Sequence, residues 1–390
     1  MNYGDNGFVR VAISSVKQNK MTMKKSILLA PMLMLLGFII SCTDKDAPNV
    51  IRFPFENVDL SADWETADPV AVGVVDIEKV RTEAEKLTRL TSVIVIRDGK
   101  LVLEEYFKGF KRDSLHDVRS VVKSVVSMLM DRMISEGFIQ SVDDPIGDYL
   151  SDKFELTEEQ EKITLRNLLT MTGGFEWFES GGTGFNEWIT SDDHIGFLLN
   201  KPVSDQPGSR FNYNSAGVHL LGVTMTEVTG LGLYELAEKY LLDELSFFNS
   251  GWQLLSDNYI NGGSAIALRP LDMAKLGQLM LQDGFSGEKR ILSSEWVEES
   301  TKPFFDWRSN YGDLRGHSYG HLWWTQETSE FDSFLAWGFG GQFIYVVPEK
   351  NLVVVTTNNW INSTAAGGVQ KLEFETLDLI VNQIIPKVLE

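Results

Sequence analysis

Serine followed three residues later by lysine can form an activated nucleophile, because a neutral lysine amine can accept the hydroxyl proton. The chain contains this Ser-x-x-Lys spacing at Ser14–Lys17, Ser120–Lys123 and Ser286–Lys289. The first copy lies upstream of a segment with the features of an export signal, and the third lies in a polar turn, where the lysine should be solvated and protonated. Only Ser120 lies just ahead of a long apolar run at helical spacing. We therefore expect Ser120 to be the nucleophile and Lys123 its proton acceptor.

The predicted position of Ser120 at a helix N-terminus has a chemical consequence. Backbone N–H groups and the positive end of the helix dipole lie near its hydroxyl. Lys123 follows one turn later on the same face. Apolar neighbours disfavour the charged ammonium, so the amine can become a base. The alternative is a helix-capping serine followed by an exposed lysine.

A second polar segment, Phe211–Gly217, follows a turn and precedes a predicted helix. Its Tyr213 is a candidate for sharing protons with Ser120 and Lys123 and for protonating a leaving group. Ser215, two residues on, is a candidate substrate-binding residue. The alternative for Tyr213 is simple packing at the entry of the helix.

A third element is the glycine-rich segment Ala336–Gln342, which enters a predicted strand. Glycines allow the backbone to approach a ligand closely. A backbone N–H near Gly340 or Gly341, together with that of Ser120, is predicted to form an oxyanion hole. The alternative is a glycine bulge without a ligand. Three tryptophans are candidates for lining the cavity: Trp177, Trp188 and Trp337.

The elements that must position these residues follow a clear order along the chain. Apolar, β-branched runs flank an Asp-Gly turn at residues 97–100, which predicts a hairpin. Residues 342–347 and 352–357 predict a second hairpin, and helical periodicity fills the region between the two. Strands at both ends with helices between them predict an α+β fold, in which one antiparallel sheet is built from both chain ends.

Composition and motifs exclude several classes of protein. The chain has 390 residues, is 43% apolar and carries a formal net charge of −20, so a substantial core is expected and nucleic-acid binding is not. No zinc-protease, Walker A or dinucleotide-binding motif occurs, and the five histidines have no metal-ligand spacing. We therefore expect neither a metal nor an organic cofactor. A Ser-His-Asp triad stays open, although no local motif supports it.

The N-terminal region predicts export. Lys24 and Lys25 precede the apolar stretch Ile27–Ile40, which is short for a membrane span and typical of a signal peptide. Cys42, the one cysteine, follows directly and resembles the lipidated cysteine of a bacterial lipobox. The expected organisation is a signal peptide with an upstream extension (1–41), a lipidated tether (42–70) and a hydrolase domain (71–390). The expected location is the bacterial cell envelope, outer-membrane or periplasm-facing, with a lipid anchor on Cys42.

The order Ser120-x-x-Lys123, Tyr213-x-Ser215 and glycine-rich strand resembles the serine β-lactamase/penicillin-binding superfamily. Within it, the chain is most similar to class C-like hydrolases of the 6-aminohexanoate-dimer hydrolase and esterase group. The resemblance implies the β-lactamase/transpeptidase-like fold and hydrolysis of small-molecule or short-peptide esters or amides through an acyl-enzyme. Two alternatives remain: a non-catalytic ligand-binding lipoprotein that retains the fold, and a D-alanyl-D-alanine peptidase.

Two positions depart from the pattern of that superfamily. Ser215 stands where the second motif often has Asn, and Trp337 stands where the third motif usually has Lys or His. A cationic side chain at the latter position would bind a substrate carboxylate such as that of penicillins. Trp337 cannot do so, and we therefore expect weak β-lactamase activity.

Overall fold

The computed structural model describes residues 2–3, 8–10, 56–180, 184–361 and 368–389. The predicted signal-peptide segment from Lys24 onwards and the predicted lipidation site Cys42 lie outside these residues, as does the first Ser-x-x-Lys copy; of the predicted upstream extension, two short strands are described. The two strands are β1 (Asn2–Tyr3) and β2 (Phe8–Arg10).

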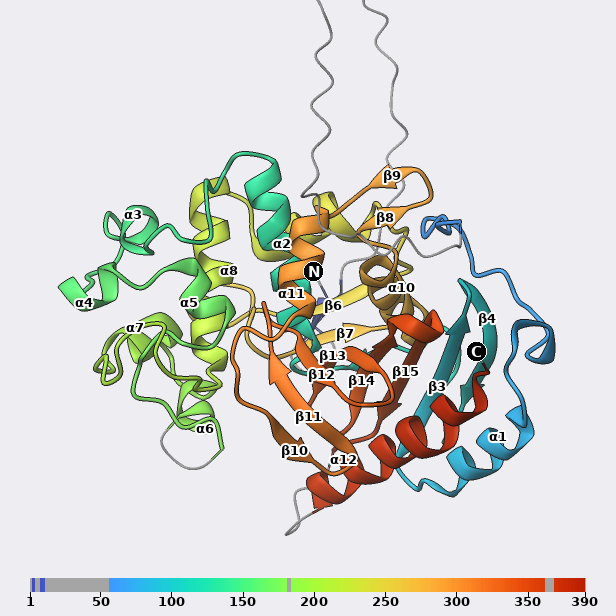
Figure 1. The fold of residues 1–390 in the computed structure, drawn as a ribbon. Helices are drawn as coiled ribbons and strands as arrows, with labels where there is room; N and C mark the ends of the chain where they lie inside the picture. The colour runs from blue at the N-terminus through green and yellow to red at the C-terminus, as the bar shows by residue number, and fades with distance from the viewer. Residues whose placement is uncertain (1, 4–7, 11–55, 181–183, 362–367, 390) are drawn as a thin grey trace, which may run out of the picture. The chain divides into compact units, whose positions relative to one another are not determined.

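The main sheet has eight antiparallel strands in the order β10-β11-β12-β13-β14-β15-β3-β4 (Figure 1). Strands from the two ends of the chain meet where β15 pairs with β3, so both ends build one sheet, as predicted. In spatial order the strands are β10 (Ser309–Tyr311), β11 (Leu314–Tyr319), β12 (Trp324–Glu327), β13 (Asp332–Gly338), β14 (Gln342–Val347), β15 (Leu352–Asn358), β3 (Leu90–Arg97) and β4 (Lys100–Tyr106).

Both predicted hairpins are confirmed. Strands β3 and β4 pair from Arg97 and Lys100 outwards, and the Asp98-Gly99 turn between them has positive φ at both residues. Such a turn favours Asp-Gly because these residues tolerate the left-handed region. Strands β14 and β15 form the second hairpin.

The sheet is buried on both faces, which explains why its central strands are almost continuously apolar. Along β3, Ile94 and Ile96 belong to one core cluster, whereas Val93 and Val95 belong to the other. This alternation follows from the two-residue period of a strand. The first cluster includes the buried side of α2 (Val121–Ser135) and of α10 (Pro270–Leu281).

The second core cluster joins the sheet to helices from opposite ends of the chain. These are α1 (Ile77–Lys86) and α12 (Gly368–Asp378), the latter continued by a π-helical turn (Leu379–Ile384) and a 3-10 turn (Ile385–Lys387). Figure 1 shows α1 in light blue and α12 in red on this face. This arrangement places α12 beside the end of β13, where the candidate site lies.

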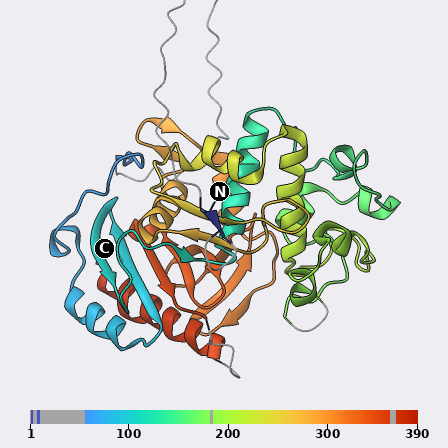
Figure 2. The same ribbon diagram turned by 180° about the vertical axis from the view of Figure 1, so that it is seen from behind.

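Most of the remaining helices gather beside the sheet around α8 (Ser215–Thr229), as both views show (Figures 1 and 2). The fold is therefore α+β, as predicted. These helices are α3 (Gly147–Leu150), α4 (Glu158–Glu161), α5 (Leu165–Leu169), α6 (Phe185–Trp188), α7 (His194–Leu199) and α9 (Leu233–Ala237) with the π-helical turn Glu238–Leu242. Helix α11 (Ser294–Thr301) lies beside α2 instead, where the Trp296 indole N–H donates to Ser127 Oγ at 3.2 Å.

A smaller sheet has the order β1-β2-β6-β7-β5. Its other strands are β5 (His116–Asp117), β6 (Ser250–Gln253) and β7 (Ile266–Leu268), and a separate hairpin joins β8 (Phe285–Ser286) to β9 (Lys289–Arg290). Strand β5 pairs with β7 just before Ser120, which anchors the segment that leads into α2. Within the described residues, none of the helices has the length and hydropathy needed to cross a bilayer.

The segment 56–70 belongs to the predicted lipidated tether (42–70) but is packed on the domain. Leu60 is buried in the first core cluster, and its N–H donates to Ser286 Oγ at 2.9 Å. Trp64 packs against the same cluster, and Thr66 bridges to Leu101 of β4. The packed domain therefore starts before the predicted residue 71, because the apolar side chains of Leu60 and Trp64 pack against the first core cluster.

Candidate active site

Ser120 occupies the N-cap position of α2, and its side chain makes no capping hydrogen bond. The preceding residue, Arg119, has φ of 51°. Left-handed backbone at a residue with a side chain is strained, and such strain concentrates at functional sites. The segment is fixed by the hydrogen bond from Val118 N–H to Ile266 O at 2.8 Å. The Ser120 hydroxyl is thus presented at the helix N-terminus, as predicted from the sequence.

Lys123 lies one turn later and is 1% exposed. Its Nζ is 2.9 Å from Ser120 Oγ and 2.9 Å from Ser215 Oγ, and it also donates to the backbone carbonyl of Gly263. Three acceptors satisfy an ammonium. A neutral amine can retain two of these bonds as a donor and turn its lone pair towards Ser120. The site therefore accommodates both protonation states of the lysine without rearrangement.

Burial lowers the pKa of Lys123 to about 7. Desolvation is the largest cause; the Glu179 carboxylate acts in the opposite direction, and the Arg119 guanidinium adds to the lowering. A substantial fraction of the lysine is therefore neutral near pH 7, which is the state a general base requires.

Tyr213 comes from the loop before α8, and Asn214 caps that helix by accepting from Gly217 N–H at 2.9 Å. The phenol ring lies 4.8 Å from Lys123 Nζ and stacks on Trp324 with a centroid separation of 5.8 Å. Burial raises the pKa of Tyr213, the Glu179 charge raises it further, and a hydrogen bond with Ser120 opposes the rise. Tyr213 is therefore a protonated phenol beside Ser120, able to donate.

Glu179 is a site residue that the sequence reasoning missed. Its carboxylate accepts from Ser215 N–H at 3.0 Å, from the Ser215 hydroxyl and from the Trp177 indole N–H at 2.7 Å. A continuous chain of hydrogen bonds thus runs from Ser120 through Lys123 and Ser215 to Glu179. One glutamate within a long loop is a weak signal, since only the fold brings it to Ser215.

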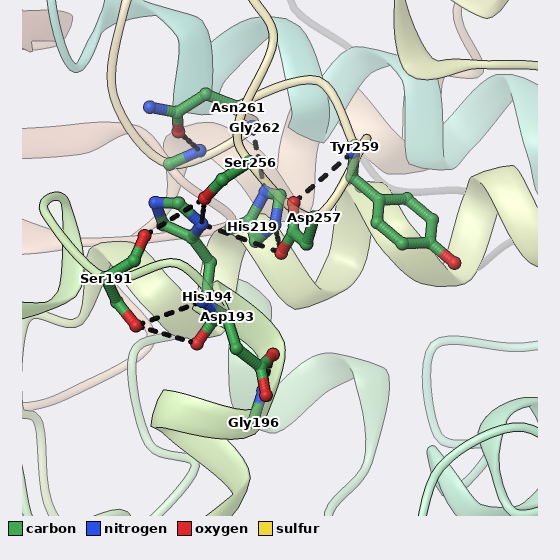
Figure 3. A network of polar contacts seen from close by, with 12 residues as sticks. Ser191, Asp193, His194, Gly196, His219, Ser256, Asp257, Tyr259, Asn261 and Gly262 are labelled. Carbon is green, nitrogen blue, oxygen red and sulfur yellow. Dashed lines mark hydrogen bonds and ion pairs between the residues drawn. The ribbon is translucent and has the colours of Figure 1, made fainter.

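The carbonyl that holds Lys123 belongs to the loop 261–264. Asn261 Oδ1 accepts from the N–H groups of Gly263 and Ser264 at 3.0 and 2.9 Å, and Gly262 N–H donates to His219 Nδ1 at 3.4 Å (Figure 3). A Cβ on Gly263 would collide with the carbonyl oxygen of Ser215. Glycine is required at this position, and the loop is held from behind by buried polar side chains.

The contacts in this network exclude one possible Ser-His-Asp triad, that of Ser256, His194 and Asp257. Ser256 Oγ lies 3.3 Å from His194 Nδ1, and Asp257 Oδ2 lies 3.7 Å from that same nitrogen (Figure 3). A triad needs the serine and the carboxylate on opposite ring nitrogens, so this cluster cannot act as one. Among the described residues, no group of three or more His, Cys, Asp or Glu side chains is arranged to hold a metal ion.

The glycine-rich turn lies close to the nucleophile segment, but not in the way we expected. A Cβ on Gly338 would collide with the carbonyl oxygen of Val118, so this glycine brings the end of β13 close to the segment that leads to Ser120. The N–H of Gly340 donates to Glu373 Oε1 at 2.9 Å, which leaves it unable to bind an oxyanion. Gly341 has φ of 81°, and its carbonyl accepts from Asn358 Nδ2 at 2.8 Å. Both glycines thus shape the turn.

Phe339 is a further candidate in this turn for donating to an oxyanion. It follows Gly338 and lines the cavity with Ser120. Within the described residues its N–H has no hydrogen-bond acceptor. Periodicity alone could not distinguish it from Gly340, because the direction of each N–H depends on the shape of the turn.

The cavity beside Ser120 has a volume of about 700 Å³. Trp337 lines it, as expected. Trp177 and Trp188 do not: they are 2% and 0% exposed and belong to the first core cluster, where Trp177 supports Glu179. The lining residues are Arg119, Ser120, Glu179, Ser180, Phe185, Asn186, Tyr213, Ser264, Tyr311, His317, Trp324, Trp337, Phe339 and Glu373.

Comparisons with known proteins agree with this geometry. Residues 81–369 match the Beta-lactamase family. The chain belongs to this family. It is 24% identical over 314 residues to a 6-aminohexanoate-dimer hydrolase of Paenarthrobacter ureafaciens, covering 75% of this chain and 77% of that relative.

Solved structures share the fold, among them a penicillin-binding protein homologue and a hydrolase. The octameric penicillin-binding protein homologue from Pyrococcus abyssi superposes with a TM-score of 0.62 at 19% identity, over 81% of this chain and 79% of the other. EstCE1, a hydrolase with promiscuous acyltransferase activity, gives 0.63 at 16% identity, over 78% of this chain and 98% of the other. The predicted β-lactamase-like fold is confirmed.

Proteins of the Beta-lactamase family with this fold are serine hydrolases, and the chain is one of them. Against the pattern of the family, Ser215 fills the place of the usual Asn as a link between Lys123 and Glu179. Trp337 fills the place of the usual Lys or His, and its indole N–H lies 3.4 Å from Glu373 Oε1. At the position where family members commonly have a cationic side chain, this chain has the Trp337 ring, and the carboxyl group of Glu373 lies beside it.

Proposed function

We propose that the protein hydrolyses small esters or amides through an acyl-enzyme on Ser120. The observation that carries this proposal is the buried Lys123 amine, which lies 2.9 Å from the Ser120 hydroxyl with its pKa lowered to about 7. The name of one relative, a 6-aminohexanoate-dimer hydrolase, supports a substrate of modest size. The cavity volume of about 700 Å³ is in the range of small-molecule sites.

In the proposed acylation, neutral Lys123 accepts the Ser120 proton while Ser120 Oγ forms a bond to the substrate carbonyl carbon. The negative charge on the carbonyl oxygen is stabilised by the N–H groups of Ser120 and Phe339. Collapse of this intermediate breaks the bond to the leaving group. The leaving group takes a proton from the Tyr213 phenol, which regains one from Lys123.

Deacylation reverses these roles. Water attacks the acyl carbonyl and gives its proton to the same Lys123–Tyr213 pair, and Ser120 departs as an alkoxide that is reprotonated. The carboxylate of Glu179 orients Ser215, and Ser215 in turn holds Lys123. Glu179 is therefore proposed as a positioning residue that also tunes the basicity of the lysine.

A fluorophosphonate probe and a panel of short-chain p-nitrophenyl esters test this proposal. We expect covalent labelling and ester turnover in the native chain, and loss of both in Ser120→Ala. Labelling that persists in Ser120→Ala would place the nucleophile elsewhere. Absence of labelling and turnover in the native chain would favour the non-catalytic binding protein instead.

β-Lactams and D-alanyl-D-alanine peptides are proposed to be poor substrates, because both carry a carboxylate and Trp337 offers it no positive charge. Nitrocefin turnover at the rate of an efficient β-lactamase would contradict this expectation.

We also propose that the enzyme works in the bacterial cell envelope, anchored through a lipid on Cys42. The support is the sequence alone: Lys24 and Lys25, the apolar stretch Ile27–Ile40 and the cysteine that follows it. Metabolic labelling with a palmitate analogue in a bacterial host should mark the native chain and not Cys42→Ala. Equal labelling of both would refute the anchor.

A further inference from the structure

Glu373 of α12 is a buried carboxyl group that the proposed mechanism does not use. It is 5% exposed and lines the same cavity as Ser120. Its oxygens accept from Gly340 N–H at 2.9 Å, from Tyr311 OH at 2.6 Å and from the Trp337 indole N–H at 3.4 Å.

The contacts of Glu373 favour its charged form. The N–H groups of Gly340 and Trp337 can only donate, and a carboxylate accepts from both as well as from the Tyr311 hydroxyl, whereas a neutral acid would have to give its proton to the Tyr311 oxygen. Burial raises the pKa of Glu373 above its ordinary value, and the three hydrogen bonds offset part of that rise. A buried negative charge with no cation among these partners attracts a positive group strongly.

The other charged groups of the cavity do not neutralise it. Arg119, the one Lys or Arg among the lining residues described, donates to Asp117 at 3.4 Å and lies 4.7 Å above the Trp360 ring. His317 is 6% exposed, and burial lowers its pKa, so it is neutral at pH 7. Glu179 is the second carboxylate, but it neighbours Lys123, where a substrate cation would compete with the catalytic amine.

The side chains that line the cavity near Glu373 are aromatic. The rings of Tyr311 and Trp337 are 4.8 Å apart, and those of Trp337 and Trp324 are 5.2 Å apart. Aromatic faces attract cations through their quadrupole, and proteins recognise quaternary ammonium ligands in this way. The formal net charge of −20 adds a long-range electrostatic potential that also attracts cations.

We propose that the cavity selects substrates that carry an ammonium group, and that Glu373 is the residue that determines this specificity. The inference rests on the proposed hydrolase function. Aromatic faces hold the alkyl substituents of the cation, and the Glu373 carboxylate supplies the opposite charge. A purely structural role, in which Glu373 only fixes the Gly340 turn, would affect cationic and neutral substrates equally.

Three thioesters of butyrate separate these roles. Butyrylthiocholine carries a trimethylammonium group, S-(3,3-dimethylbutyl) thiobutyrate is its neutral carbon isostere, and S-butyryl-3-mercaptopropionate is anionic. Hydrolysis of each releases butyrate and one thiol, which a thiol reagent measures. For the native chain we expect kcat/KM to fall in that order, with the cationic ester about tenfold above the neutral one, equivalent to about 1.4 kcal/mol.

Glu373→Gln keeps the shape of the side chain and removes its charge. We expect the cation-to-neutral ratio of kcat/KM to fall to about one in this variant, whatever happens to the individual rates. Glu375→Gln is the matched control, since Glu375 lies on the same helix and pairs with Lys371. The control should keep the native ratio.

A second measurement needs no variant: choline should inhibit hydrolysis of the neutral thioester more strongly than 3,3-dimethylbutanol does. A native ratio near one, an unchanged ratio in Glu373→Gln, or equal inhibition by the two alcohols would overturn the specificity proposal while hydrolysis continues. Failure of all three thioesters, with no Ser120-dependent labelling by the fluorophosphonate, would instead overturn the hydrolase function on which it rests.

Discussion

Two Ser-x-x-Lys motifs in the packed domain have the same spacing and opposite surroundings. Lys123 is 1% exposed, contacts the hydroxyl of its own serine and has its pKa lowered to about 7. Lys289, in the β8–β9 hairpin, has a side chain that is 61% exposed and pairs with Glu244. Its serine, Ser286, accepts from Leu60 N–H instead. The comparison shows that burial of the amine, and not the motif, creates the candidate base.

The difference begins in secondary structure. In a helix, residues three apart lie on one face, so Ser120 and Lys123 meet. In the β8–β9 hairpin, Ser286 and Lys289 are cross-strand partners. The ammonium of Lys289 is exposed there and is solvated by water. Helix α2 is also buried along most of its length, whereas both residues of β9 are exposed.

The largest expected effect separates the two lysines directly. Lys123→Ala should lower kcat for a p-nitrophenyl ester by about 10³-fold or more, because the nucleophile loses its base. Lys289→Ala should retain the native rate. Circular dichroism and thermal melting check that both variants fold. Equal rates for the two variants would refute the assignment of the first motif.

The second test concerns a partner that the hairpin motif lacks. Tyr213→Phe keeps the ring stacked on Trp324 and removes the proton donor. We expect kcat to fall by about 10²-fold for an ester with a poor leaving group, and less for p-nitrophenyl esters, whose leaving group needs little protonation. A loss that is equal for both leaving groups would argue against proton delivery by the phenol.

The third test uses pH. Because only neutral Lys123 can accept the proton, kcat/KM should rise as pH increases through about 7 and then level off. Glu179 raises the pKa of this lysine, so in Glu179→Gln the rising limb should move to lower pH. A limb that stays in place, measured with a neutral ester, would show that another group controls it.

The smallest effect is on stability. The pKa of Lys123 is lower in the folded chain than its ordinary value of 10.5. Between pH 7 and 10.5 the unfolded chain therefore binds more protons, and stability should rise with pH by up to about 1.4 kcal/mol per pH unit from this group. Urea unfolding at pH 7.5 and 9.5 should show a smaller rise in Lys123→Met than in the native chain. Lys289→Met should match the native rise.

Much of the fold could be predicted because its signals are local. The Asp98-Gly99 turn requires positive φ at both residues, so its two strands could be paired from the sequence. Helix α2 could be placed because its apolar side chains follow the helical period. The short strands between residues 309 and 338 were not predicted in the same way, since each covers few residues and depends on its neighbours in the sheet.

What the sequence by itself determined is the set of chemical groups and their order: a serine and lysine one helical turn apart, a tyrosine before a second helix and a glycine-rich turn. Tertiary structure decided which of them meet and in which state. It buried Lys123, directed the Gly340 N–H to Glu373 rather than to the substrate, moved Trp177 into the core and brought Glu179 to Ser215. Spacing along a chain specifies local neighbours, but desolvation and the direction of each hydrogen bond arise only where distant segments pack together.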